Sequence, residues 1–172
     1  MSAIDVGCKR TLVPRSVFRS VTIAAVAMAE VVSIHIAGER NGPAHELSSA
    51  EVVTDYGIQG DWRSHSGNSR QLTLIDEEAL LATGRELRST VPDGASRRQV
   101  VVRGLTLNST VGKTLSLGQV LIAVTGLCHP CENMERTIGP GAQMAMANRG
   151  GVSARVLQGG TLRPGDRILV QE

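Results

Sequence analysis

The chain has 172 residues, 41% hydrophobic and 20% charged, which is the balance of an ordinary globular protein with one domain. A net charge of +2 is too small to indicate a nucleic-acid-binding protein, and with only 2% aromatic residues the core must consist of Val, Ile, Leu, Met and Ala. Three cysteines cannot form a closed disulfide framework, so a reducing, cytoplasmic location is expected.

The first 27 residues differ in character from the rest. The stretch CKRTLVPRSVFRS is basic without an acidic residue, and the apolar run VTIAAVAMA after it ends in small residues. This is the pattern of a signal peptide, although the run is too short to span a bilayer. The alternative, which we favour, is that Met28 opens the domain and residues 1–27 are a disordered extension or a mis-assigned start. No membrane association is expected.

From residue 31 onward, short apolar runs alternate with turns that contain glycine. Runs of four to six residues with this spacing are typical of strands. The pattern predicts one domain over 28–172 that is mainly β with a few helices, its strands closing into a β-barrel. The predicted strands are 31–36, 50–54, 71–75, 99–102, 119–124, 153–157 and 167–170.

Two helical regions are predicted between these strands. The first begins after Asp76, which can cap it, and the acidic residues 77–78 suit the positive end of the helix dipole. The second covers about 132–148 and is interrupted by Gly-Pro-Gly at 139–141.

The stretch GIQGD at 57–61 is interpreted as a structural turn more than a binding loop. Gly57 and Gly60 suit backbone conformations with positive φ, and Asp61 can accept hydrogen bonds from nearby backbone amides.

Cys128 and Cys131 flank a His-Pro pair and leave several readings open. A C-x-x-C after a strand and before a helix is typical of a thioredoxin-like dithiol, but the chain is rich in strands and carries the pair far from its N-terminus. A zinc site needs two more ligands, and no second C-x-x-C exists. The remaining candidates are Cys8, His35, His45, His65 and His129, of which His35 is more typical of a satisfied structural histidine.

Two buried, inert thiols are a further reading, since free cysteine is often buried. Against it, Pro130 and the polar residues 132–133 place the pair in a loop, where chemistry tends to lie. We expect Cys131 to be the reactive thiol, because it can lie at the N-terminus of a helix, where backbone N–H groups favour a thiolate. Cys128 is expected to point into the sheet and to be dispensable.

Six segments, in a common order over about 28–172, resemble the MOSC domain family, named for the C-terminal part of molybdenum cofactor sulfurases. Trp62 stands where the family usually has a basic residue, and Gln99 where it usually has Asn. The segments are VVSIHIA (31–37), GIQGD (57–61), SRQLTLID (69–76), SRRQVVVRGLTLNSTVGKTLSLG (96–118), TGLCHPCENME (125–135) and RGGVSARVLQGGTLRPGD (149–166).

The resemblance implies a mixed barrel of the pyruvate kinase β-barrel-like class, with one functional cysteine in a pocket. That cysteine matches Cys131, and Cys128 belongs to a subgroup with a C-x-P-C form. The family is linked to binding the molybdenum cofactor (molybdopterin) or carrying sulfur through this cysteine. Members are implicated in detoxifying N-hydroxylated bases and in reductive chemistry at molybdenum. The implied partners are molybdopterin, a sulfur donor or acceptor protein, or a separate reductase, since the chain has no flavin or iron–sulfur motif.

The residue chemistry agrees with these implications. A thiolate is a soft ligand suited to molybdenum, which Cys131 and, beside it, Cys128 could offer. The phosphate of the pterin calls for arginine, and 16 of the 18 basic residues are Arg. The candidates for phosphate or pterin contacts are Arg70, Arg97, Arg98 and Arg149.

Three classes of function remain open: an enzyme or cofactor-binding protein, a non-enzymatic persulfide carrier, and a partner-binding module. The pyridoxal phosphate of full-length sulfurases is not expected. That cofactor needs a Schiff-base lysine, and the two lysines are Lys9 in the extension and Lys113 in a turn flanked by glycine.

Overall fold

The computed structural model describes residues 28–171 of the chain, so the predicted extension, with Cys8 and Lys9, lies outside the described residues. The strands are β1 (Glu30–Ile36), β2 (His45–Leu47), β3 (Ala50–Val53), β4 (Gly57–Ile58), β5 (Leu72–Asp76), β6 (Val100–Arg103), β7 (Thr114–Leu117), β8 (Val120–Leu127), β9 (Val152–Gln158), β10 (Gly160–Leu162) and β11 (Ile168–Gln171). The helices are α1 (Glu77–Leu87), α2 (Glu132–Ile138) and α3 (Ala142–Ala145), with 3-10 turns η1 (Asp93–Ser96) and η2 (Leu107–Thr110).

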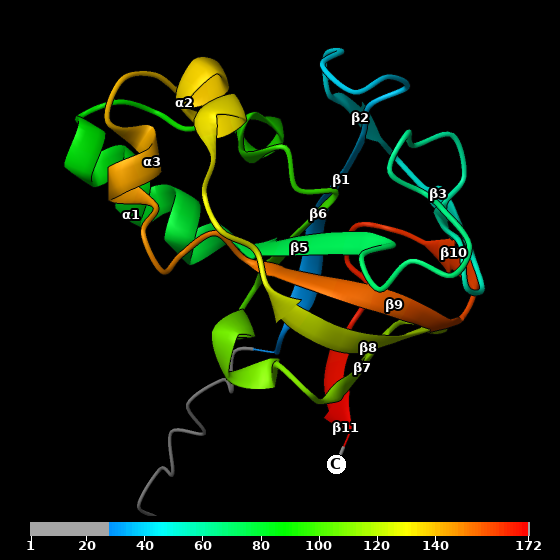
Figure 1. Cartoon of the computed structure of the whole chain (residues 1–172). Helices are drawn as coiled ribbons and strands as arrows, with labels where there is room; N and C mark the ends of the chain where they lie inside the picture. The colour runs from blue at the N-terminus through cyan, green and yellow to red at the C-terminus, as the bar shows by residue number, and fades with distance from the viewer. Residues whose placement is uncertain (1–27, 172) are drawn as a thin grey trace, which may run out of the picture.

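The strands form one large mixed sheet and one small sheet. The large sheet has the order β11-β7-β8-β9-β5-β6-β1-β2, in which only β5 and β6 pair in parallel. The small sheet is β10-β3-β4. Figure 1 shows α1, α2 and α3 grouped at one side of the molecule, whereas β2, β3 and β10 lie at the other. The prediction of a mainly β domain with a few helices is confirmed.

The large sheet curls until β11, at one end of the strand order, meets β1, which is next to the other end, but its ladder does not continue into a closed barrel. An isolated bridge joins Glu30 to Arg167. Val31 N–H donates to Asp166 O at 2.9 Å, and Ile168 N–H donates to Ala29 O at 2.8 Å. These bonds bring the start of β11 against the start of β1, so the strands come together there without forming the closed barrel that was predicted.

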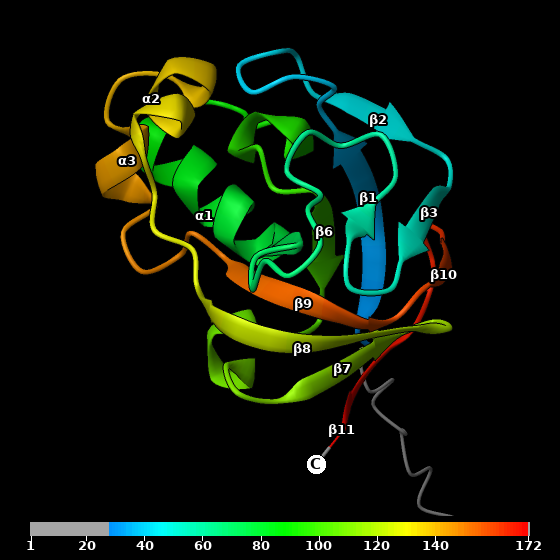
Figure 2. The ribbon, with the colours of Figure 1, turned by 45° about the vertical axis from the view of Figure 1, so that its right-hand side comes forward.

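The core has two layers that meet at β5 and β6. Val100 and Val102 belong to the aliphatic cluster enclosed by the curled sheet, whereas Val101 belongs to a smaller cluster beneath the helices. All three are fully buried, because side chains alternate between the two faces of a strand and both faces of β6 are covered. Figure 2 shows α1 lying alongside β6. Met134 of α2 and Met146 after α3 fill the second cluster, so the helices that border the cysteine segment are anchored on the sheet.

The helices agree with the prediction except in the role of one residue. Helix α1 starts after Asp76 as predicted, but the Asp76 side chain makes no cap hydrogen bond. Its Oδ1 instead accepts from Leu107 N–H at 2.8 Å, because η2 packs against the end of β5. The second predicted helix is divided into α2 and α3 at the Gly-Pro-Gly stretch. No helix in the described part of the chain is long and apolar enough to cross a membrane.

The GIQGD stretch is a structural turn, as predicted. Gly57 has φ 122° and Gly60 has φ 86°. A Cβ at Gly57 would lie 2.4 Å from Gln71 O, so no larger residue fits. The buried Asp61 accepts from Ala37 N–H at 3.0 Å through Oδ2 and from Arg63 N–H at 2.8 Å through Oδ1. The turn is thereby tied to the end of β1.

Replacing Asp61 with Ala should lower the free energy of unfolding by about 2–3 kcal/mol, because two backbone donors lose a charged acceptor in a buried place. Urea denaturation followed by circular dichroism measures the change. Glu39→Ala, at an exposed carboxylate in the neighbouring loop, is the control and should have little effect. Unchanged stability in Asp61→Ala would contradict a structural role for this turn.

Glu135 joins α2 to α3 and makes their stability dependent on pH. Its carboxylate accepts from Gly141 N–H at 2.5 Å and from Gln143 N–H at 2.6 Å. These backbone hydrogen bonds, first that of Gln143, lower the pKa of Glu135 below its ordinary value of 4.5. A lowered pKa in the folded state means that the stabilisation is present above the ordinary value and is lost as the pH falls through the lowered pKa.

We therefore expect Glu135→Gln to reduce stability at pH 7 and to converge with the wild-type protein in strong acid. Urea midpoints measured from pH 7 to pH 2.5 test this, with Glu132→Gln as the matched control on the same helix. A difference between Glu135→Gln and wild type that stays constant over this range would show that the carboxylate does not cap α3.

Candidate functional site

The two cysteines lie on the segment that leads from β8 to α2, and they face different surroundings. Cys128 follows β8 directly, its N–H donates to Gly151 O at 2.8 Å, and its side chain is buried. Cys131 is the N-cap residue of α2 and is exposed. Its carbonyl accepts from Met134 N–H at 2.8 Å, so the start of the helix fixes the backbone that carries the thiol. The predicted placement of both thiols is confirmed, whereas their relative reactivity stays a prediction.

The turn before β9 packs directly against this segment. A Cβ at Gly150 would lie 1.9 Å from Cys128 O, so only glycine allows the two backbones to approach so closely. The RGG motif at 149–151 therefore serves the packing of the cysteine segment.

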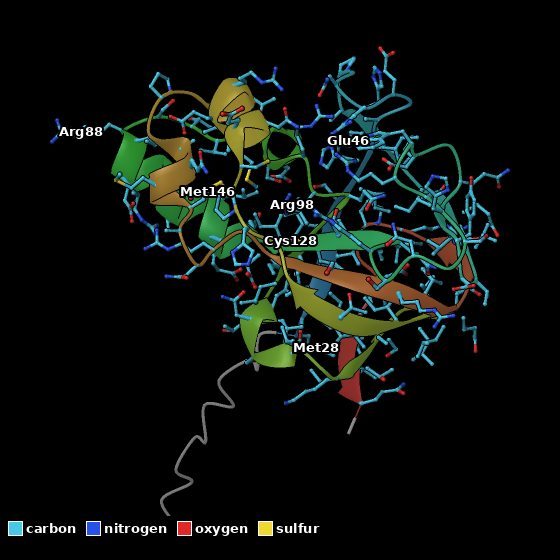
Figure 3. The ribbon with its side chains drawn as sticks, in the orientation of Figure 1. Met28, Glu46, Arg88, Arg98, Cys128 and Met146 are labelled. Carbon is cyan, nitrogen blue, oxygen red and sulfur yellow. The ribbon has the colours of Figure 1, made fainter. Side chains whose placement is uncertain are left out.

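Arg98 is the buried centre of the site. It is 4% exposed. Its Nε donates to Gly150 O at 2.6 Å and its Nη2 donates to His129 O at 3.3 Å. Figure 3 shows Arg98 close to Cys128, where the chain leaves β8 for α2. The guanidinium thus holds the cysteine segment and the Gly150 turn together.

The charge of Arg98 has no carboxylate partner within residues 28–171. Burial lowers the pKa of Arg98, the nearby thiols of Cys128 and Cys131 oppose this shift, and Arg70 and Arg63 add to it. A buried cation is unfavourable unless an anion compensates it. A thiolate or a bound anion at this place would supply that compensation.

A pocket of about 370 Å³ opens beside Cys131, and we call it the arginine pocket. Among the described residues, five arginines and no Asp or Glu line it, a set suited to an anionic ligand such as a phosphate. Its other walls include Trp62, His65, Asn68 and Asn133. The arginines are Arg40, Arg63, Arg70, Arg97 and Arg98.

Protein contacts hold two of the remaining arginines in place. Arg97 has φ 57° and donates to Gly42 O at 2.9 Å and to Arg40 O at 3.1 Å. Arg63 pairs with Asp61 at 3.3 Å and its guanidinium lies 4.9 Å from the centroid of the Trp62 ring. Burial lowers the pKa of Arg63, Asp61 opposes the shift, and the like charges of Arg97 and Arg70 add to it. The effect of Arg97 and Arg70 on this pKa means that the positive charges of the three arginines lie close enough to repel one another.

Arg40 and Arg70 differ from these, because their guanidinium groups make no hydrogen bond or ion pair within the described residues. Both side chains are exposed. They are therefore free to bind a ligand in the pocket without breaking a protein contact.

The structure brings together four of the predicted site residues, Cys131, Arg70, Arg97 and Arg98, and places Cys128 close to Arg98. Arg149 does not line the arginine pocket. It binds Glu86 at 2.6 Å and borders a separate hollow.

Sequence reasoning missed Arg40, Arg63 and Trp62. Trp62 and Arg63 directly follow the GIQGD turn, so the turn itself was the available signal. For Arg40 there was none, because it lies in a loop that matches no family segment. Lys113 does not line the pocket.

A zinc site gains no support from the arrangement. In the part of the chain that the structure describes, no three His, Cys, Asp or Glu side chains gather to hold a metal ion. His35 is buried and its Nε2 lies 3.0 Å from Ser33 Oγ, so it is the satisfied structural histidine that the sequence indicates.

Replacing Arg98 with Met should lower the free energy of unfolding by about 2–4 kcal/mol, because buried carbonyls lose a charged donor. It should also slow the alkylation of Cys131 by iodoacetamide, since a nearby positive charge favours the thiolate. Urea denaturation and peptide mass mapping measure the two effects. The control is Arg149→Met, outside the pocket, which should leave alkylation unchanged. Equal alkylation in Arg98→Met and wild type would show that Arg98 does not influence the thiol.

Comparison with known proteins supports the fold and the family. Among curated protein sequences, none matches the chain. YuaD from Bacillus subtilis superposes with a TM-score of 0.68 at 16% identity, covering 83% of this chain and 96% of YuaD. YiiM from Geobacillus stearothermophilus gives 0.68 at 18% identity, covering 84% of this chain and 75% of YiiM. YiiM from Escherichia coli superposes with a TM-score of 0.61 at 21% identity, covering 83% of this chain and 69% of that YiiM.

At these identities the similarity of structures shows a shared fold. The family follows from the sequence itself, because the profile of the MOSC domain matches residues 61–169. That match contains the end of the GIQGD turn, the arginine pair at 97–98 and the cysteine segment. The chain belongs to the MOSC domain family.

Proposed function

We propose that this protein binds the molybdenum cofactor, with its phosphate in the arginine pocket and Cys131 as its thiolate ligand. The observation that carries the proposal is the arginine pocket itself, which within residues 28–171 is lined by five arginines, no Asp or Glu, and an exposed cysteine. Membership of the MOSC family agrees with this ligand, but the proposal depends on the site.

The donor set fits the chemistry of that cofactor. Arg40 and Arg70, whose guanidinium groups make no hydrogen bond or ion pair within residues 28–171, would hold the phosphate. Arg63, Arg97 and Arg98 are fixed by protein contacts and would supply a positive field without moving. The thiol of Cys131 supplies the soft ligand that suits molybdenum.

Each residue has a separate task in this arrangement. Arg98 would stabilise the thiolate of Cys131 and hold the segment that carries it. The guanidinium of Arg63 lies over the Trp62 ring, 4.9 Å from its centroid, and would hold the indole in place at that wall of the pocket. When bound, the cofactor supplies a metal centre for reductive chemistry, and the substrates that we propose are N-hydroxylated compounds. A separate reductase would be the electron donor, and a cytoplasmic location would keep the thiols reduced.

Purification of the full chain from cells that make the cofactor tests the proposal. We expect the wild-type protein and Cys128→Ser to retain pterin and molybdenum, measured by fluorescence of the oxidised pterin and by elemental analysis. Cys131→Ser should lose most of the molybdenum. The double variant Arg40→Ala/Arg70→Ala should lose pterin by about tenfold or more, the effect of two weakened charged hydrogen bonds.

Arg149→Ala is the matched control for the double variant and should retain the pterin. Wild-type protein that carries neither pterin nor molybdenum when isolated from a competent cell would contradict the proposal. So would full pterin retention in the double variant.

A second function, carriage of a persulfide on Cys131, is favoured by one observation. The Cys131 side chain is exposed, as a sulfur atom that passes to another protein must be. Incubation of pterin-free protein with a low-molecular-weight persulfide, which passes its outer sulfur to the Cys131 thiolate and leaves as a thiol, would then add one sulfur atom to the chain, and peptide mass mapping would place it at Cys131. Failure of a sulfur acceptor to discharge it would argue against the carrier.

A further inference from the structure

Cys131 borders two hollows, and only one of them is the arginine pocket. The other hollow, of about 400 Å³, is lined by Pro130, Cys131, Glu132, Asn133 and Gln143. Cys131 and Asn133 line both hollows, so the residue that carries the thiol borders the two of them. We call the other hollow the Glu132 hollow.

The two hollows have opposite electrostatic character. The arginine pocket has five guanidinium groups and no carboxylate in its walls. The Glu132 hollow has the carboxylate of Glu132, the amides of Asn133 and Gln143, and no cationic side chain. An anion is therefore drawn to the first side of the thiol, and a cation or a neutral polar molecule to the second.

The walls of the Glu132 hollow are fixed by contacts between α2 and α3. Gln143 N–H donates to Glu135 Oε2 at 2.6 Å, and Gln143 Nε2 lies 3.5 Å from Pro130 O. Arg136 donates to Asn133 Oδ1. The N–H groups of the Asn133 amide take no part in that bond. The hollow thus presents a built set of amide groups and one carboxylate beside the thiol.

We propose that the Glu132 hollow receives the molecule that reacts beside Cys131, and that this molecule is a small neutral or cationic compound with hydrogen-bonding groups. Its positive or polar end would face Glu132, and its donors and acceptors would meet the amides of Asn133 and Gln143. An anionic anchor would meanwhile fill the arginine pocket. The inference rests on the proposed function, because that function assigns the anion to the arginine pocket. It adds where the reacting molecule binds and which charge that molecule carries.

Charged thiosulfonate reagents of similar size can test this on the full chain. A cationic and an anionic methanethiosulfonate are applied to the Cys8→Ser protein, and the rate of modification of Cys131 is read by peptide mass mapping, with and without saturating pyrophosphate. We expect pyrophosphate to slow the anionic reagent strongly, because both compete for the arginine pocket. The cationic reagent should continue to react through the Glu132 hollow.

Glu132→Gln should lower the ratio of cationic to anionic rates by about tenfold, because one unit charge about 6 Å away in a watery dielectric changes each rate by about threefold and in opposite directions. Glu132 is exposed and its carboxylate makes no hydrogen bond within residues 28–171, so this variant should fold normally. Glu51→Gln, on β3 at the other side of the molecule, is the control and should leave the ratio unchanged.

Two results would overturn the inference: pyrophosphate that blocks both reagents equally, or a Glu132→Gln variant with an unchanged ratio. A different result would count against the proposed function. If pyrophosphate fails to slow the anionic reagent, the arginine pocket does not hold anions as proposed. The ratio measured in Glu132→Gln without pyrophosphate still decides whether the cation approaches from the Glu132 side.

Discussion

The buried guanidinium of Arg98 is the contact on which the site depends. It joins the His129 carbonyl of the cysteine segment to the Gly150 carbonyl of the turn before β9, at 3.3 and 2.6 Å. These two segments come from the ends of neighbouring strands and have no regular structure of their own. The guanidinium donates in two directions from a rigid planar fork and so fixes the positions of both carbonyls, whereas the ammonium of a lysine rotates and fixes them less firmly. The position of Cys131 follows from this bond, because α2 starts where the segment ends.

The same guanidinium makes the stability of the fold and the chemistry of the site inseparable. Asp61 offsets the charge of Arg63, but Arg98 is more deeply buried and has no such partner within residues 28–171. A buried charge without a counter-ion costs several kcal/mol, and hydrogen bonds to carbonyls offset only part of this cost. An anion at the pocket would therefore stabilise the protein as it binds. If the arginine pocket binds an anion as proposed, that ligand supplies the counter-charge that the described protein does not give to Arg98.

Seven of the eleven strands within residues 28–171 and the family were predictable from sequence, whereas the full pocket and the strands β2, β4, β7 and β10 were not. Strands such as β1 and β9 carry short apolar runs between glycine turns, and these signals are local. The pocket is assembled from segments near residues 40, 63, 70, 98 and 131, whose approach depends on how the sheet curls. Arg149 matched the family pattern and neighbours Gly150, yet its side chain points to Glu86, because adjacency along the chain does not set direction. Asp76 similarly accepts a hydrogen bond from Leu107 N–H and does not cap its own helix. No local sequence motif predicts this tertiary contact.

The Gly-Pro-Gly break between α2 and α3 ends one helix and also determines the shape of the site. In a continuous helix, Glu132 and Gln143 would lie eleven residues and about 16 Å apart along the axis. The break turns the chain back, and Glu135 holds the turn by accepting from Gly141 N–H and Gln143 N–H. Gln143 consequently reaches Pro130 and faces the same hollow as Glu132. The Glu132 hollow therefore forms because the helix ends at the Gly-Pro-Gly stretch. The arginine pocket, in the same way, forms because the curl of the sheet brings its segments together.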